Sequence, residues 1–327
     1  MSRFRLFAAA VTILVGFLAA GVWAQGLTLA VQTVDTMNTL WGRHSFTRAN
    51  HAKGVVVEGS FTGTPAAVAL SKAAIFAGQP VAVTVRFSDS TGLPAVADGS
   101  PQANPRGMAI KFYDATGDLD VIANSLPFFP VATGEDFLAL LQALAASGPD
   151  VPKPTPADQF IAAHPSVGKA FGAVATPVSF ASETYNGIDT FIFINAKGER
   201  QPFRFQLVPV RGTQHLSPEE AAKMPPDFLV DELPARLAKE AVAFRLFAQL
   251  ANPGDQTKDP TQPWPDDRRR VHVGTLVLST AAADNVKAQR DLRFLPNRLA
   301  SGIEVSDDPL IDARVRAYVI SFGRRVH

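Results

Sequence analysis

Two residues near the C-terminus, Arg314 and Tyr318, have the types and the spacing of a metal-binding pair. They are four positions apart, which places them one turn apart on the same face of a helix. A free phenol has a pKa of about 10 and binds metals poorly at neutral pH, but a guanidinium beside it favours the phenolate. Tyr318 is therefore a candidate oxygen ligand. An amphipathic helix with one half-buried tyrosine would contain the same pair, so the pair alone does not distinguish a metal ligand from a structural tyrosine.

Further polar residues that could do chemistry lie far upstream. Arg86 and Ser88 belong to the alternating segment 81–88 and, at a period of two residues, share one face of a strand. His51 lies just before another strand pattern at 54–61. A lone histidine is more often a hydrogen-bonded structural residue than a catalyst, and a lone arginine is usually a solvated charge. The other candidates of this kind are Arg48, Asn124 and Arg325.

The elements that must position these residues are mostly strands. Strand patterns occur at 54–61, 81–88, 107–113, 118–122 and 271–278, and a hairpin with an Ala-Lys-Gly turn occupies 191–209. Helical patterns occur at 34–40, 66–76, 134–144, within 225–250 and around Tyr318. Because strands and helices do not alternate regularly, the sequence predicts an α+β protein with an antiparallel sheet or closed barrel and attached helices.

Composition excludes several classes of protein. The chain has 327 residues, of which 46% are hydrophobic and 19% charged, as in an ordinary globular protein. A net charge of +1 gives no reason to expect a nucleic-acid partner. The absence of cysteine excludes disulfides, thiolate metal sites and cysteine nucleophiles.

The N-terminal segment 1–24 has the pattern of an export signal. Arg3 and Arg5 precede an apolar run from Leu6 to Ala20, and small residues near Ala24 offer a cleavage site. An uncleaved membrane anchor is the alternative, since the run is close to the about 20 residues that span a bilayer. Either interpretation predicts a periplasmic or otherwise exported protein, with residues 25–327 forming a single domain.

Several motifs, in this order, resemble those of the haem catalase superfamily. They are Arg-x-x-His-Ala-Lys-Gly at 48–54, Val-Arg-Phe-Ser at 85–88, Arg-Gly-Met-Ala-Ile-Lys-Phe-Tyr at 106–113, Asn-x-x-Pro-x-Phe at 124–129, Phe-x-Pro followed by Gly-Ile-Glu-x-Ser-x-Asp from 294, and Arg-x-x-x-Tyr at 314–318. The resemblance implies a catalase-type antiparallel β-barrel of about eight strands with surrounding helices. It also implies haem, with haem b the simplest expectation.

The resemblance assigns a role to each candidate. It implies that Tyr318 is the proximal haem ligand and that Arg314 holds it as the phenolate. It matches His51 to the distal histidine, Ser88 to the hydroxyl that orients the imidazole, and Asn124 to the distal amide that steadies peroxide. Phe137 matches the aromatic side chain that stacks on the ring. The residues matched to guanidiniums beside the haem propionates are Arg48, Arg86 and Arg325.

The chain departs from a typical catalase in three features. We expect it to lack the C-terminal helical domain and the long N-terminal arm of full catalases, and Asn50 stands where catalases usually carry a small apolar residue. These features resemble the compact, exported catalase-related peroxidase branch. The expected function is a haem peroxidase that reduces hydrogen peroxide or organic peroxides with a small organic reductant, through a high-valent iron intermediate and with at most weak catalase activity. An oligomer would not be the arm-exchanged tetramer of full catalases.

Three other functions remain open at this point. A true catalase, a haem enzyme that rearranges fatty-acid hydroperoxides, and a non-catalytic haem carrier would all use the same pocket. The set of His51, Ser88 and Asn124 weighs against the carrier, because a carrier has little need of acid–base groups on its open face.

Overall fold

The computed structural model describes residues 25–114 and 117–326, and the predicted leader at 1–24 lies outside these ranges. The strands are β1 (Gly54–Gly63), β2 (Val81–Asp89), β3 (Arg106–Tyr113), β4 (Leu119–Asn124), β5 (Thr176–Pro177), β6 (Tyr185–Asn186), β7 (Phe191–Ile194), β8 (Arg200–Pro209), β9 (His215–Leu216), β10 (Val242–Leu250), β11 (Arg270–Ala281) and β12 (Ile303–Val305). The helices are residues 25–41, α2 (Pro65–Val68), α3 (Gly134–Ala145), α4 (Pro156–Ala163), α5 (Pro165–Gly172), α6 (Pro218–Ala221), α7 (Phe228–Leu237), α8 (Asn285–Asp291) and α9 (Pro309–Val326). Within these ranges, no helix combines the length and apolar character needed to cross a membrane.

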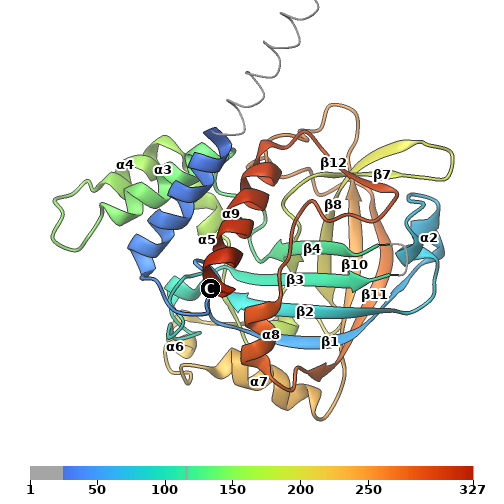
Figure 1. Ribbon diagram of the computed structural model, residues 1–327, viewed down its shortest axis with the longest axis horizontal. Coiled ribbons are helices and arrows are strands. Elements are labelled where there is room, and N and C mark those ends of the chain that lie inside the picture. Colours follow the sequence, from blue (N-terminus) through green and yellow to red (C-terminus); the bar gives the residue numbers. More distant parts are fainter. Residues whose placement is uncertain (1–24, 115–116, 327) are drawn as a thin grey trace, which may run out of the picture.

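Eight strands of the described chain close into an antiparallel barrel, as predicted. Their hydrogen-bonded order is β10, β11, β1, β2, β3, β4, β6 and β8, and β8 pairs again with β10 to close the ring. Strands β7 and β12 extend the sheet beyond β8. Figure 1 shows the long strands lying side by side, with α3, α9 and the helix at 25–41 grouped at one side of the barrel.

Aromatic and β-branched side chains fill the interior of the barrel. In β2, Val81, Val83, Val85 and Phe87 alternate inward and are all buried. The Phe87 ring lies 5.6 Å from that of Phe180 in a stacked arrangement. Elsewhere in the core, Phe61 packs edge to face on Phe112, and Phe203 on Phe205. Aromatic pairs in these geometries stabilise a core beyond the area that they bury.

The outer face of β2 is exposed at its start and buried at its end. Ala82 is exposed, whereas Arg86 and Ser88 on the same face are buried. The difference arises because the helix at 25–41 and α9 lie beside the ends of β2, β3 and β4 (Figure 1). The fold therefore covers polar side chains on the outside of the barrel, and that is where a site can form.

Two predicted helical segments are helical only in part, and tertiary hydrogen bonds explain both. In 66–76, α2 ends at Val68 because Ser71 donates to Gly302 O and Lys72 N donates to Ile194 O, which ties this segment to the sheet edge. In 225–250, α7 ends at Leu237 and the remainder is β10, which pairs on both sides and buries every second residue. The helix predicted at 34–40 is longer than expected and spans 25–41.

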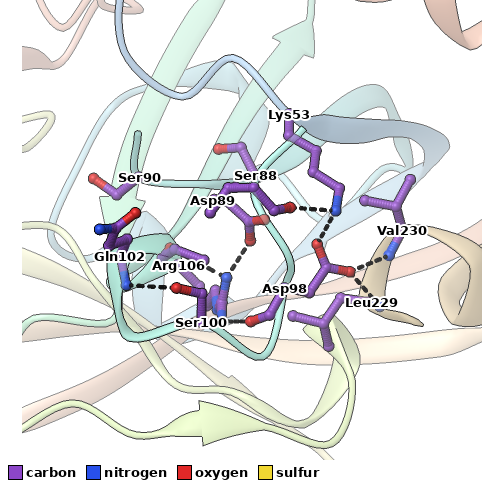
Figure 2. Close-up of polar contacts among 12 residues, drawn as sticks. Lys53, Ser88, Asp89, Ser90, Asp98, Ser100, Gln102, Arg106, Leu229 and Val230 are labelled. Atoms are coloured by element: carbon purple, nitrogen blue, oxygen red, sulfur yellow. Dashed lines mark hydrogen bonds and ion pairs between the residues drawn. The ribbon is translucent and has the colours of Figure 1, made fainter. Parts of the chain in front are cut away.

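A buried network of charges holds the ends of β1 and β2 in place (Figure 2). The Arg106 side chain is fully buried, and it donates to Asp89 Oδ1, to Asp98 O and, over 3.1 Å, to Ala103 O. Lys53 Nζ lies 2.5 Å from Asp98 Oδ1. Burial raises the pKa of Asp89 to about 7, although Arg106 opposes the rise. Asp89 directly follows Ser88, and Lys53 lies two residues after His51. The network therefore fixes the backbone next to these two candidate site residues.

Substituting Arg106→Met should destabilise the protein by about 3–5 kcal/mol, because Asp89 would lose its buried cationic partner. Urea unfolding of the purified protein at pH 7 measures the change. Arg200→Met is the matched control, since Arg200 and Glu304 form an exposed ion pair, and such pairs contribute about 0–1 kcal/mol. Equal losses in the two variants would contradict a structural role for the buried network.

Candidate active site

All nine residues singled out by the sequence line a single cavity. It has a volume of about 240 Å³ and lies between the outer face of β2, β3 and β4 and the helices 25–41, α3 and α9. Most of the remaining wall is apolar and includes Leu29, Met37 and Phe129. The nine predicted residues in the lining are Arg48, His51, Arg86, Ser88, Asn124, Phe137, Arg314, Tyr318 and Arg325.

Helix α9 supplies the proximal side of the cavity. One turn of the helix separates Arg314 from Tyr318, and Arg314 Nη2 donates to the phenol oxygen over 3.1 Å. Arg314 Nη1 donates to Asp189 Oδ2, so this guanidinium is shared between the two side chains. Burial alone would lower the pKa of Arg314, but Asp189 and Tyr318 outweigh it and raise that pKa. Arg314 therefore stays charged, and its guanidinium lies against the phenol oxygen of Tyr318.

Asp189 is a residue of this site that sequence reasoning missed. It lies in the connection between β6 and β7, is 2% exposed, and its Oδ1 atom has no hydrogen-bond partner among the described residues. No local pattern marks it, because its relation to Arg314 spans 125 positions of sequence. Only the packing of α9 against this connection brings the two together.

The register of three strands builds the distal side. Ser88 of β2 pairs with Gly107 of β3, and Gly107 pairs with Asn124 of β4, so the three residues form a row across the sheet. His51 has a left-handed backbone with φ of 58°, and its Nδ1 lies 3.0 Å from Ser88 Oγ. A Cβ at position 107 would lie only 2.9 Å from His51 Nδ1. The missing side chain of Gly107 thus makes room for the imidazole, which is a role that the motif at 106–113 did not reveal.

The imidazole of His51 is neutral in this environment. Burial lowers its pKa to about 3, and the nearby charges of Arg86, Arg48 and Arg314 contribute to the decrease. With Nδ1–H donating to Ser88 Oγ, Nε2 is left as a proton acceptor. Ser90, which sequence reasoning also missed, places a second hydroxyl 3.5 Å from Nε2.

Asn124 completes the distal side with an amide. Its Oδ1 accepts a hydrogen bond of 2.9 Å from Leu126 N, which fixes the orientation of the side chain. The amide nitrogen has no partner among the described residues and can donate to a ligand in the cavity that Asn124 lines.

Three guanidiniums lie together at one end of the cavity without a carboxylate partner in the described part of the chain, and two of them, those of Arg86 and Arg325, belong to buried residues. Arg48 and Arg325 both donate to Leu292 O just after α8, and Arg86 donates to Gln289 Oε1 and His51 O. Burial, followed by the charges of Arg86 and Arg325, lowers the pKa of Arg48. Burial likewise lowers the pKa of Arg86 to about 9 and that of Arg325 to about 10. A ligand with two negative charges would offset the mutual repulsion of these guanidiniums.

These features fit a haem. Two propionates would offset charge among the three guanidiniums, an ionised Tyr318 offers an oxygen ligand, and the apolar wall suits a porphyrin. Phe137 lies in that wall, with its ring 5.6 Å from the ring of Phe129. The barrel and its cavity are those of a haem-binding protein.

Comparison with known proteins shows the family to which the chain belongs. The sequence model of the Catalase family matches residues 20–326, and the chain belongs to this family. A catalase-related peroxidase of Mycolicibacterium paratuberculosis is 35% identical over 299 residues, which cover 90% of this chain and 94% of that protein. A catalase-related peroxidase of Synechococcus elongatus is 31% identical over 317 residues, which cover 95% and 91%.

Solved structures show the same fold. A fungal catalase aligns with a TM-score of 0.77 at 24% identity over 85% of this chain, and catalase A of Saccharomyces cerevisiae aligns with a TM-score of 0.74 at 22% identity over 85%. The alignments span 59% and 61% of those longer chains. At these identities the likeness establishes the barrel and its helices, and it does not establish the chemistry of the cavity.

Substituting Gly107→Ala should displace the His51 ring and slow the reaction with peroxide about 100-fold, the cost of a misplacement of about 1 Å. The added Cβ would lie within 3 Å of both Ser88 Oγ and His51 Nδ1. Stopped-flow absorbance of the haem-loaded enzyme measures the rate, and the haem content should not change. Gly148→Ala is the control, because a Cβ there meets no atom within 4 Å. A parental rate in Gly107→Ala would show that the ring position is unimportant.

Substituting Asp189→Asn should raise the reduction potential of the bound haem. Without the carboxylate, the whole charge of Arg314 acts on Tyr318, and a phenolate that donates less charge favours reduced iron. A spectroelectrochemical titration measures the potential. Asp255→Asn is the control, since Asp255 forms an ion pair of 2.7 Å with Arg268 outside the cavity lining. An unchanged or lower potential in Asp189→Asn would exclude this influence.

Proposed function

We propose that the protein is a haem-dependent peroxidase that reduces hydrogen peroxide or organic peroxides at the expense of a small organic donor. The observation that carries this proposal is the neutral imidazole of His51, held by Ser88 in the cavity that Tyr318 also lines. The two catalase-related peroxidases, which match this chain over more than nine tenths of their own length, favour a peroxidase over a true catalase.

The chain's own residues have distinct tasks in this proposal. Tyr318 would ligate the iron of haem b as a phenolate, with Arg314 stabilising its charge. Phe137 would stack on the porphyrin. When bound, the haem supplies an iron centre that can take up the two oxidising equivalents of a peroxide. The side chains that would pair with its propionates are Arg48, Arg86 and Arg325.

His51 performs the proton transfers. With haem and peroxide bound, its Nε2 would accept a proton from one peroxide oxygen and return it to the other, which would leave as water or an alcohol. Ser88 Oγ accepts from Nδ1–H and keeps Nε2 in the basic form. The amide nitrogen of Asn124 donates to the peroxide and orients it, and the buried setting of the imidazole prevents its protonation by solvent at neutral pH.

Location and assembly stay predictions from the sequence. Export to the periplasm, with cleavage or retention of a membrane tether, depends on residues 1–24, which lie outside the described part. An oligomer that does not exchange N-terminal arms is likewise proposed from the sequence pattern.

Under a fixed hydrogen peroxide load, the purified haem-loaded protein should oxidise a phenolic dye and release little oxygen. Replacing His51→Ala should lower dye oxidation about 10²- to 10⁴-fold, the usual contribution of a general acid–base group, while the absorption band of bound haem persists. His272→Ala is the matched control, because His272 bonds to Thr275 on β11 and does not line the cavity. Stoichiometric oxygen release without dye oxidation would indicate a true catalase, and full activity of His51→Ala would refute the distal role.

A further inference from the structure

A small hollow adjoins the haem cavity and shares Arg48 with it. Its volume is about 20 Å³, enough for one water-sized group. The hollow is bounded by the helix at 25–41, the loop that follows it and α9, and its cationic side chains are Arg43, Arg48 and Arg324. It therefore has the size and the charge to take one end of an anionic molecule.

The positive charge of this hollow is only partly compensated. Arg324 Nη1 lies 2.6 Å from Asp35 Oδ1. Arg43 is exposed, and neither it nor Arg48 has a carboxylate within ion-pair distance in the described ranges. Arg48 is held instead by the carbonyl oxygens of Gln289 and Leu292, at 2.8 and 2.9 Å. Two of the three guanidiniums are therefore available to an added anion.

A bound haem would not remove this excess. Two propionates carry two negative charges, whereas Arg48, Arg86, Arg293 and Arg325 in the cavity lining carry four positive charges. Positive charge therefore remains. Arg48 is the member of this set that also lines the hollow, so an anion bound there would meet a guanidinium that borders the haem cavity as well.

We infer that this hollow binds the carboxylate of the organic electron donor, and a phenolic acid serves as the donor that tests it. The inference rests on the proposed peroxidase function. Each donor molecule gives up one electron and its phenolic proton. Two donors with one hydrogen peroxide yield two phenoxyl radicals and two water molecules, which balances electrons and atoms. The carboxylate keeps its charge throughout and serves only to hold the donor at Arg48, with Arg43 and Arg324 at the rim.

The test compares two donors that differ only in charge. Haem-loaded enzyme is assayed with 4-hydroxybenzoate and with its uncharged analogue 4-hydroxybenzamide, and binding of 4-hydroxybenzoate to the resting enzyme is measured separately by calorimetry. We expect a lower KM for the acid than for the amide. Arg43→Gln and Arg324→Gln should each raise the Kd and the KM of the acid about three- to fivefold, as loss of one exposed charge contact does, with the amide unchanged. Raising the salt concentration should weaken binding of the acid only.

The matched control is Arg245→Gln, which removes an exposed arginine from β10 outside both lining sets. It should leave both donors at parental values. Benzoate, which lacks the phenol, should compete with 4-hydroxybenzoate, and inorganic phosphate at the same concentration should not.

Three outcomes would overturn the inference: equal KM values for acid and amide, no change in the Kd of the acid in Arg43→Gln or Arg324→Gln, or competition by phosphate equal to that by benzoate. Failure of the peroxidase function is recognised separately. In that case neither phenol is oxidised while peroxide is consumed, and calorimetry with 4-hydroxybenzoate and the same variants still decides whether the hollow binds carboxylates.

Discussion

Compensation of buried positive charge is the constraint on which this structure depends. Five arginines line one cavity, and within the described chain only Arg314 among them has a carboxylate partner, Asp189. Removing charges from water is costly unless partners offset them. The carbonyl oxygens at the end of α8 hold Arg48 and Arg325 in place but do not neutralise them. The cavity is therefore shaped electrostatically for an anionic cofactor, and the same cations add to the effect of burial in keeping His51 neutral.

The site lies on the outer surface of the barrel. The interior of the barrel is filled by phenylalanine and valine side chains, so it has no room for a ligand as large as a haem. At the ends of β2, β3 and β4 the outward row of Ser88, Gly107 and Asn124 sets the distal groups in fixed register. A shift of one residue in either pairing would turn one of these side chains to the core, so the same hydrogen bonds that close the barrel also fix the site.

The proximal and distal sides are supported in different ways. Behind Ser88, the ions of Lys53, Asp89, Asp98 and Arg106 are buried and paired, and they fix the strand ends (Figure 2). Behind Tyr318, the shared guanidinium of Arg314 connects the helix to the loop that carries Asp189. The first arrangement fixes the positions of the strand ends, and the second places a positive charge beside the oxygen of Tyr318.

The local sequence determined several strands, the family and most of the candidate site residues of this protein. The strand patterns at 54–61, 81–88 and 107–113 correspond to β1, β2 and β3, and ordered motifs indicated the catalase family and the nine residues that line the cavity. Periodicity and motif spacing are local properties, which is why they could be read directly. The failures involve long-range contacts: the segment 242–250 pairs in the sheet in place of forming a helix, and hydrogen bonds to Gly302 and Ile194 interrupt the helix predicted at 66–76. Asp189, the space at Gly107 and the hollow beside Arg48 could be decided only by the tertiary structure, because each depends on atoms that are far apart in the chain and meet only when the barrel closes and the helices pack against it.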